Sequence, residues 1–223
     1  MKAAEVYQAH RPDTVVGEFN LKKLIPSGAG LGGGSSDAAA ALRLLDRANP
    51  SPLGEDTLLK LAAKVGSDCP YFIKSTTAIM SGRGEILESV SPQVASALKG
   101  RRVIIVKPPF GVVTQDAYAL LAKSKVYDSK SVAKQKLQDW MNQPTSDPSL
   151  LGNTLESVVF NKYLALPVAL AEVARATGIN FRMTGSGSAC FTFCRTQFDP
   201  QAVRVILERC WGEGVWVCET EIL

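Results

Sequence analysis

Residues 26–41 read Pro-Ser-Gly-Ala-Gly-Leu-Gly-Gly-Gly-Ser-Ser-Asp-Ala-Ala-Ala-Ala, and they decide how the rest of the 223-residue chain is interpreted. The five glycines of this stretch allow positive φ and a close approach of backbone N–H groups to a ligand. Ser35, Ser36 and Asp37 are favourable N-cap residues, and the alanines and leucines behind them favour a helix. The stretch is therefore predicted to be a loop that opens a helix near Ser36.

A helix that begins directly after a glycine-rich loop is a favourable anion site, because its first N–H groups are unpaired and its dipole is positive there. The P-loop pattern fails, since Gly34 is followed by Ser35-Ser36 rather than by Lys-Ser/Thr. The dinucleotide pattern G-x-G-x-x-G is matched literally, but the acidic residues about 20 positions on begin a helix instead of ending a strand. A flexible Gly/Ser linker is disfavoured, because a linker would not run into an alanine-leucine helix.

Composition excludes several other classes of protein. Hydrophobic residues make up 46% of the chain, which is typical of a globular protein of one large domain or two ordinary ones. No apolar run reaches the length of a membrane span, and residues 1–7 lack the apolar core of a signal peptide, so we expect a cytoplasmic protein. The net charge of +4 is spread over scattered basic residues, so neither nucleic acid nor a membrane is expected as a partner.

Cysteine and histidine chemistry is also disfavoured. The cysteines are odd in number and lack C-x-x-C spacing, so they are expected to be buried thiols rather than disulfides or zinc ligands; they are Cys69, Cys190, Cys194, Cys210 and Cys218. His10 is the only histidine and stands at a predicted helix exit beside Arg11-Pro12. A Ser-His-Asp hydrolase would depend on it entirely, and a surface histidine is the better interpretation.

The first part of the chain is predicted to be mostly helical. Helices are expected over 1–11, from Ser36 to Asn49-Pro50, and over 55–65 with Gly66 as C-cap. Between the first two, Phe19, Leu21 and Ile25 alternate with polar residues and predict a strand over 18–25. Residues 77–80 and 85–90 flank Ser-Gly-Arg-Gly, which is a hairpin signal.

The second part restarts a strand-and-helix pattern after a composition break at 91–100. The expected elements are a buried strand over 102–107, a helix from Thr114 as cap to Leu121, a polar stretch over 123–148 with a helix near 132–141, a helix over 166–177 ended by Gly178, strands over 181–184 and 190–194 joined by a glycine turn, a helix over 200–210 and a strand over 215–220. This order predicts an α+β protein with a ferredoxin-like plait and helical insertions. The break divides the chain into expected domains at 1–99 and 100–223.

Residues 26–36 resemble, nearly letter for letter, the nucleotide-phosphate loop of the GHMP kinases. Val-Gly-Ser-Asp-Cys-Pro-Tyr-Phe at 65–72 is similar to the family's Gly-Ala-Asp-Val-Pro-Phe-Phe motif. Gly-Arg-Gly-Glu at 82–85 has a counterpart in the family, and Asn-Thr-Leu-Glu-Ser-Val-Val-Phe at 153–160 resembles its Asn-Asp-Leu-Glu-Pro-Val-Val segment. Thr-Gly-Ser-Gly-Ser-Ala at 184–189 resembles the third family motif. The resemblance implies the two-lobed GHMP kinase fold.

The resemblance also implies an activity, namely ATP-dependent phosphorylation of a small-molecule alcohol with Mg²⁺. Asp68 matches the catalytic base, and Ser36 is expected to hold the magnesium ion. The residues expected to bind the phosphates of ATP are Pro26, Ser27, Gly28, Ala29, Gly30, Leu31, Gly32, Gly33, Gly34, Ser35 and Ser36, with Gly185, Ser186 and Gly187 in a second glycine turn. The loop has the form of the branch that phosphorylates the 2-hydroxyl of 4-diphosphocytidyl-2-C-methyl-D-erythritol in non-mevalonate isoprenoid biosynthesis.

One family motif has no match. The family places a Pro-Ala-Lys-Ile-Asn motif before its glycine loop, and the lysine works beside the catalytic aspartate. None of the 25 residues before Pro26 resembles it, so a truncated amino-terminal lobe is expected, as a fragment or through loss from the gene. Lys22, Lys23 and Lys74 are available cations, but nothing in the sequence orients them. Two alternatives therefore stay open: another small-molecule GHMP kinase, and a non-catalytic remnant that binds a nucleotide or a partner.

Overall fold

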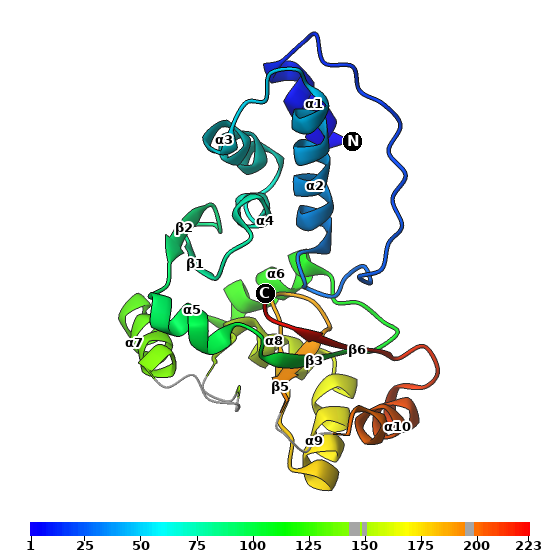
Figure 1. Ribbon diagram of the computed structural model, residues 1–223. Coiled ribbons are helices and arrows are strands. Elements are labelled where there is room, and N and C mark those ends of the chain that lie inside the picture. The colour runs from blue at the N-terminus through cyan, green and yellow to red at the C-terminus, as the bar shows by residue number, and fades with distance from the viewer. Residues whose placement is uncertain (143–147, 149–150, 195–198) are drawn as a thin grey trace. The chain divides into compact units, whose positions relative to one another are not determined.

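The computed structural model describes residues 1–142, 148, 151–194 and 199–223, which form two compact units (Figure 1). One unit comprises residues 1–26 and 32–91, and the other comprises 27–31 and 92–223. The glycine-rich stretch is thus divided, because its residues 27–31 pack with the second unit and the rest with the first. The domain boundary expected between residues 99 and 100 stays a prediction.

The first unit is a group of helices with one hairpin. Its elements are α1 (Lys2–His10), α2 (Gly33–Ala48), α3 (Glu55–Val65), α4 (Cys69–Lys74), β1 (Ala78–Ser81) and β2 (Ile86–Ser89). The helices bury an apolar cluster in which Tyr7 and Leu42 are fully inaccessible. β1 and β2 pair in antiparallel fashion. The predicted helices over 1–11 and 55–65 and the hairpin are confirmed, whereas α4 was not predicted, although Pro70 near its start is a helix signal.

The strand predicted over residues 18–25 is wrong. Among the described residues, no backbone hydrogen bond joins this segment to a strand, and Leu21 and Leu24 are 65% and 72% exposed. Phe19 instead packs against the helical cluster of the first unit. Alternation predicts a strand only where a neighbouring strand takes up the backbone groups. Here one apolar side chain is buried by helices, and the backbone stays extended without a ladder.

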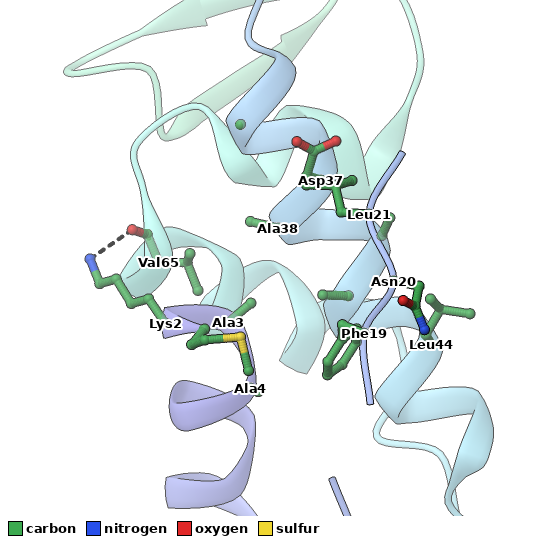
Figure 2. A pocket seen from close by; sticks show the side chains of 14 residues that line it. Lys2, Ala3, Ala4, Phe19, Asn20, Leu21, Asp37, Ala38, Leu44 and Val65 are labelled. Carbon is green, nitrogen blue, oxygen red and sulfur yellow. Dashed lines mark hydrogen bonds between the residues drawn. The ribbon is translucent and has the colours of Figure 1, made fainter. Parts of the chain in front are cut away.

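A pocket of about 610 Å³ lies between this extended segment and the helices α1 and α2 (Figure 2). Its lining is mostly apolar and includes Ala3, Phe19, Leu21 and Ala38. At its edge Lys2 Nζ donates a hydrogen bond to the carbonyl of Val65 at 2.7 Å. Most of the pocket surface is therefore apolar, although Lys2 and Gly34 also line it.

The second unit is built on a four-stranded sheet. Its elements are α5 (Pro92–Leu98), β3 (Arg102–Lys107), α6 (Thr114–Ser124), α7 (Lys130–Asn142), α8 (Thr154–Lys162), α9 (Ala165–Thr177), β4 (Arg182–Met183), β5 (Cys190–Phe193), α10 (Pro200–Trp211) and β6 (Trp216–Glu221). The strand order is β4-β5-β3-β6, and all neighbours are antiparallel. Together with the β-α-β-β-α-β succession, this order confirms the ferredoxin-like plait with helical insertions.

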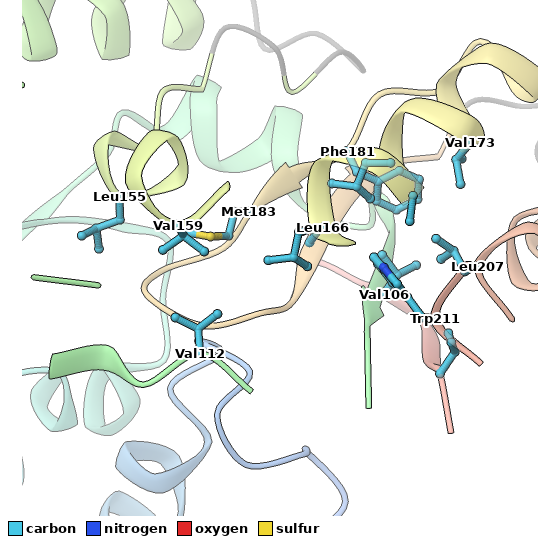
Figure 3. Close-up of a cluster of buried hydrophobic side chains, with 14 of the residues drawn as sticks. Val106, Val112, Leu155, Val159, Leu166, Val173, Phe181, Met183, Leu207 and Trp211 are labelled. Atoms are coloured by element: carbon cyan, nitrogen blue, oxygen red, sulfur yellow. The ribbon is translucent and has the colours of Figure 1, made fainter. Parts of the chain in front are cut away.

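Both faces of this sheet are covered. On one face Ile104 and Val106 of β3 join a cluster with side chains of α6, α8, α9 and α10 (Figure 3). On the other face Val103 of β3 packs with Leu98 of α5 and Trp140 of α7. Successive side chains of a strand point to opposite faces, so a strand covered on both sides is apolar throughout. This explains the uninterrupted apolar run in β3.

Several smaller predictions need correction. Val113, not Thr114, is the N-cap of α6, and the helix continues to Ser124. Helices α5 and α8 were not predicted, and residues 143–147 of the polar stretch lie outside the described residues. The cysteines are not all buried, because Cys210 is exposed and Cys194 and Cys218 are half-buried. Cys210 lies off the buried face of α10, which presents Val203, Leu207 and Trp211 at helical spacing.

Within the described ranges, no single helix is long and apolar enough to cross a membrane. α8 and α9 reach the required length and composition only as a pair that is bent by 105°.

Candidate functional site

The helix behind the glycine loop begins at Gly33, three residues before its predicted start at Ser36. Gly32 is the N-cap and adopts the left-handed conformation, φ 66°, which turns the chain into the helix early. The N–H of Ser36 donates to the Gly32 carbonyl at 2.9 Å. The N–H groups of Gly33, Gly34 and Ser35 therefore precede the first intrahelical bond and lack an intrahelical acceptor. The donors at the helix N-terminus are thus supplied by residues 33–35.

Asp68 lies in the same compact unit as this helix start. It is the N-cap residue of α4, and its side chain is exposed. α4 packs against the beginning of α2, where a Cβ at Gly32 would come within 2.7 Å of Phe72 Cζ. Burial raises the pKa of the Cys69 thiol, and a hydrogen bond with Ser35 opposes that rise. The residue after Asp68 is therefore a neighbour of the first turn of α2.

The β1–β2 hairpin also reaches Asp68. Gly84 in its turn has φ 119°, and a Cβ there would stand 2.6 Å from Asp68 Oδ1. The Ser67 hydroxyl donates to the same carboxylate oxygen at 3.3 Å. The Gly-Arg-Gly segment thus lies against the Asp68 carboxylate. Any side chain at position 84 would overlap that carboxylate, so only glycine fits there.

Lys23 is oriented by the structure, although nothing in the sequence indicated this. Its ammonium group forms an ion pair with Asp37 of α2. A Cβ at Gly33 would stand 3.3 Å from Lys23 Nζ, so this cation lies at the first turn of the helix. Lys22 and Lys74 have exposed side chains. Among the three lysines considered from the sequence, Lys23 is the one that we find at the helix N-terminus.

In the second unit, residues 27–31 of the loop pair with the chain that follows β4. The N–H of Ser188 donates to the Gly28 carbonyl at 3.1 Å, and the N–H of Ala189 donates to the Ala29 carbonyl at 3.0 Å. The Thr184 hydroxyl donates to the Gly30 carbonyl at 3.4 Å. The loop and the third glycine motif, far apart in sequence, are therefore hydrogen-bonded neighbours.

The glycines of the second turn are required by this packing. A Cβ on Gly187 would overlap the backbone of Ala29 and Gly30. A Cβ on Gly185 would stand 2.6 Å from the Gly30 carbonyl oxygen. The Ser186 hydroxyl lies 2.9 Å from the hydroxyl of Thr114 at the start of α6. The structure thus brings Gly185, Ser186 and Gly187 to the first half of the loop, while their contact with a nucleotide stays a prediction.

Lys107, which the sequence did not indicate as a site residue, is buried and binds the turn that packs against the glycine loop. Lys107 Nζ donates to the carbonyls of Pro108 at 2.8 Å and Phe110 at 3.0 Å, and burial lowers its pKa. The Ser188 hydroxyl donates to the same Phe110 carbonyl at 2.8 Å. The next residue, Gly111, lies under the loop, with its Cα 3.3 Å from a Cβ built on Gly28. A lysine at the end of an apolar strand, just before Pro-Pro, was the available signal.

The fold and the site define a class of protein: an α+β protein in which a divided glycine loop leads into a helix, and an aspartate caps a second helix that packs against the first turn of that helix. Comparison with known families agrees with this class. Residues 1–76 match the model of the GHMP kinases N terminal domain, and residues 133–213 match that of GHMP kinases C terminal.

Curated relatives and solved structures make the assignment more specific. A protein of Bacteroides thetaiotaomicron named 4-diphosphocytidyl-2-C-methyl-D-erythritol kinase is 35% identical over 89% of this chain and 67% of its own length. The protein of that name from Methylacidiphilum infernorum is 35% identical over 100% of this chain and 74% of its own length. The chain therefore belongs to the GHMP kinase family.

A crystal structure of 4-(cytidine 5'-diphospho)-2C-methyl-D-erythritol kinase superposes with a TM-score of 0.69 at 27% identity, covering 99% of this chain and 78% of that one. The mevalonate kinase of Methanococcus jannaschii superposes with a TM-score of 0.66 at 14% identity, over 100% of this chain and 74% of the other, and shows the fold alone.

Proposed function

We propose that this chain transfers the γ-phosphoryl group of ATP to the 2-hydroxyl of 4-diphosphocytidyl-2-C-methyl-D-erythritol. The relatives named for this reaction support the substrate, since they are 34–35% identical over most of the chain. The observation that carries the proposal is the position of Asp68 at the start of α4, which packs against the N-terminal turn of α2. We place the protein in the cytoplasm, as expected for an enzyme that acts on soluble phosphorylated intermediates.

Phosphoryl transfer passes through a loose transition state, so the protein contributes positioning and charge stabilisation rather than covalent chemistry. In this proposal residues 26–36 surround the phosphates. The N–H groups of Gly33, Gly34 and Ser35 donate to phosphate oxygens, and the positive end of the α2 dipole adds to the attraction. The turn of Gly185, Ser186 and Gly187 holds the first half of this loop in place and contributes further N–H groups.

Asp68 accepts the proton of the acceptor hydroxyl in this mechanism. Its exposed carboxylate accepts a hydrogen bond from the Ser67 hydroxyl, and the glycine at position 84 leaves room for it. Lys23, paired with Asp37, places its ammonium group at the helix start. Mg²⁺ typically keeps phosphate oxygens and waters as most of its ligands, and in this proposal the Ser36 hydroxyl would be its ligand from the protein. When bound, the ion would neutralise charge on the phosphate oxygens.

The first experiment tests nucleotide binding and transfer together. Saturating ATP with magnesium is expected to slow hydrogen exchange of the amides of residues 33–35. In a phosphoryl-transfer assay, Asp68→Asn is expected to reduce turnover by about 10²- to 10⁴-fold while nucleotide affinity stays unchanged, because the amide cannot accept the proton. Asp56→Asn, at the exposed first turn of α3, is the matched control and is expected to leave both quantities unchanged.

Each other outcome contradicts a stated part of the proposal. Full turnover in Asp68→Asn would remove Asp68 as the base. Transfer to a sugar, homoserine or a mevalonate derivative, but not to the methylerythritol substrate, would show another GHMP kinase. Nucleotide binding without transfer in wild type and variant would show a non-catalytic remnant, the alternative suggested by the unmatched lysine motif.

A further inference from the structure

The outer edge of β4 is closed by side chains of α8. In the β4–β5 ladder Thr184 N–H donates to the Ala189 carbonyl at 2.9 Å, so the backbone groups of the preceding residue, Met183, face away from β5. The N–H of Met183 donates to Glu156 Oε2 at 2.7 Å, and its carbonyl accepts a bond from Asn153 Nδ2 at 3.0 Å. Two side chains of one helix thus take the place of a neighbouring strand on an edge that would otherwise be unpaired.

The amide of Asn153 joins three backbone segments at once. Its Nδ2 donates a second bond to the carbonyl of Gly185 at 2.9 Å. Its Oδ1 accepts from the N–H of Leu155 at 3.0 Å and caps α8. The start of α8, the strand β4 and the glycine turn are therefore connected through a single side chain.

Glu156, one helical turn later, also binds β4 and so fixes the position of this strand against α8. Glu156 is 8% exposed as a residue, and its carboxylate is paired with Arg182, whose Nη1 lies 2.9 Å from Oε1. The backbone N–H of Met183 and the side chain of Arg182 are therefore both bound to Glu156 in the first turn of α8. The turn of residues 184–187 starts directly from this anchored strand and packs on the backbone of Ala29 and Gly30.

We propose that Asn153 is a positioning residue for phosphate binding: it sets the Gly185–Gly187 turn, which in turn holds residues 27–31 of the glycine loop. The inference rests on the proposed function, because it assigns a role at the same site. Donors that stabilise charge act best when their positions are fixed before the ligand arrives. Asn153 supplies that fixation by hydrogen bonds to the turn's backbone, without contact to the nucleotide.

Asn153→Asp is the sharpest test, because it separates the two functions of the side chain. Aspartate is as good an N-cap as asparagine, so the bond from Leu155 N–H is kept. The two donors to the carbonyls of Met183 and Gly185 are lost, and a carboxylate oxygen faces those carbonyls instead. We expect the amides of Ser188 and Ala189, which bond to the glycine loop, to exchange at least about tenfold faster in the free protein, the scale of one lost hydrogen bond.

Asp199→Asn is the matched control. Asp199 caps α10 by accepting from Gln201 N–H at 2.9 Å. The opposite substitution, from aspartate to asparagine, therefore alters an equivalent cap on another helix. This control is expected to leave the exchange of both amides unchanged. The affinity for ADP with magnesium, measured by calorimetry on both variants, is expected to fall about tenfold in Asn153→Asp only.

The outcomes distinguish this inference from the proposed function. Unchanged exchange of Ser188 and Ala189 in Asn153→Asp would overturn the positioning role even if wild type binds nucleotide. Faster exchange with undiminished nucleotide affinity would overturn it too, since the turn would then be irrelevant to binding. A wild-type chain that binds no nucleotide at all would overturn the proposed function, whatever the exchange experiment shows.

Discussion

Glu156 shows how a buried carboxylate can be both useful and costly. It accepts the Met183 N–H and pairs with Arg182, and both contacts favour the ionised form. Burial acts in the opposite direction and is the larger effect, so the pKa of Glu156 is raised above its ordinary value. A group whose pKa is raised on folding stabilises the fold at low pH and loses that contribution as pH rises through its folded pKa.

This sign makes a prediction for Glu156→Gln. Glutamine keeps an acceptor for Met183 N–H but has no proton to lose, so the variant should gain stability relative to wild type as pH rises from about 4 to 7. The measurement is urea unfolding of both proteins across that range. Glu208→Gln, on an exposed carboxylate of α10, is the control. A variant that loses relative stability with rising pH would mean that the ion pair with Arg182 outweighs burial.

At the scale of the element, α2 combines two functions at its first turn. Its later turns bury Ala39, Leu42 and Leu45 in the core of the first unit, which fixes the direction of the helix axis. Its first turn contains Gly33 and Gly34, which are poor helix formers. Nothing lies within 4 Å of a Cβ built on Gly34, so packing does not explain the glycine there.

Gly34→Ala tests whether this open space belongs to the ligand. Alanine should stabilise the helix by up to about 1 kcal/mol, because it is the stronger helix former. The added methyl group should weaken nucleotide binding, because it stands beside the N–H groups proposed to receive a phosphate. Urea unfolding and calorimetric titration measure the two effects separately. Gly17→Ala, also without close neighbours, is the control, and an unchanged affinity in Gly34→Ala would contradict a role for the glycine in phosphate approach.

At the scale of the whole molecule, the phosphate motifs are distributed over two compact units. The first unit contains the start of α2 with Asp68 and Lys23, and the second contains residues 27–31 with the Gly185–Gly187 turn. A ligand that binds only the folded chain stabilises it by mass action. Nucleotide binding should therefore be visible in global stability as well as in local exchange.

The corresponding prediction is that nucleotide binding stabilises the folded chain, which thermal unfolding measures. ATP with magnesium at about 100 times its dissociation constant should raise the free energy of unfolding by about 2.7 kcal/mol. Asp68→Asn should show the same shift, because the carboxylate takes the proton and does not hold the nucleotide. The comparison is made against magnesium alone at equal ionic strength. An absent shift at millimolar ATP with magnesium, a concentration that would saturate a micromolar site, would argue against the proposed function.

Local patterns were sufficient for much of the fold. The glycine loop, the helix over 55–65 and the strands behind residue 100 could be predicted, because helical and strand periodicities and capping residues act over a few neighbours. Asp68 could be proposed as a functional residue only through resemblance, since an aspartate before Cys-Pro is by itself an ordinary turn residue. The strand over 18–25 failed because pairing depends on a partner that alternation does not reveal.

By itself, the sequence determined the α+β class, the glycine loop that opens a helix and the four strands behind residue 100, since these follow from local propensity and spacing; the family of the loop came from resemblance. Only the tertiary structure decided that α2 starts at Gly33, that Lys23 reaches its first turn and that Asn153 holds the second glycine turn. Each of these depends on contacts between segments far apart in the chain, where close packing leaves room for one arrangement of backbone and side chain.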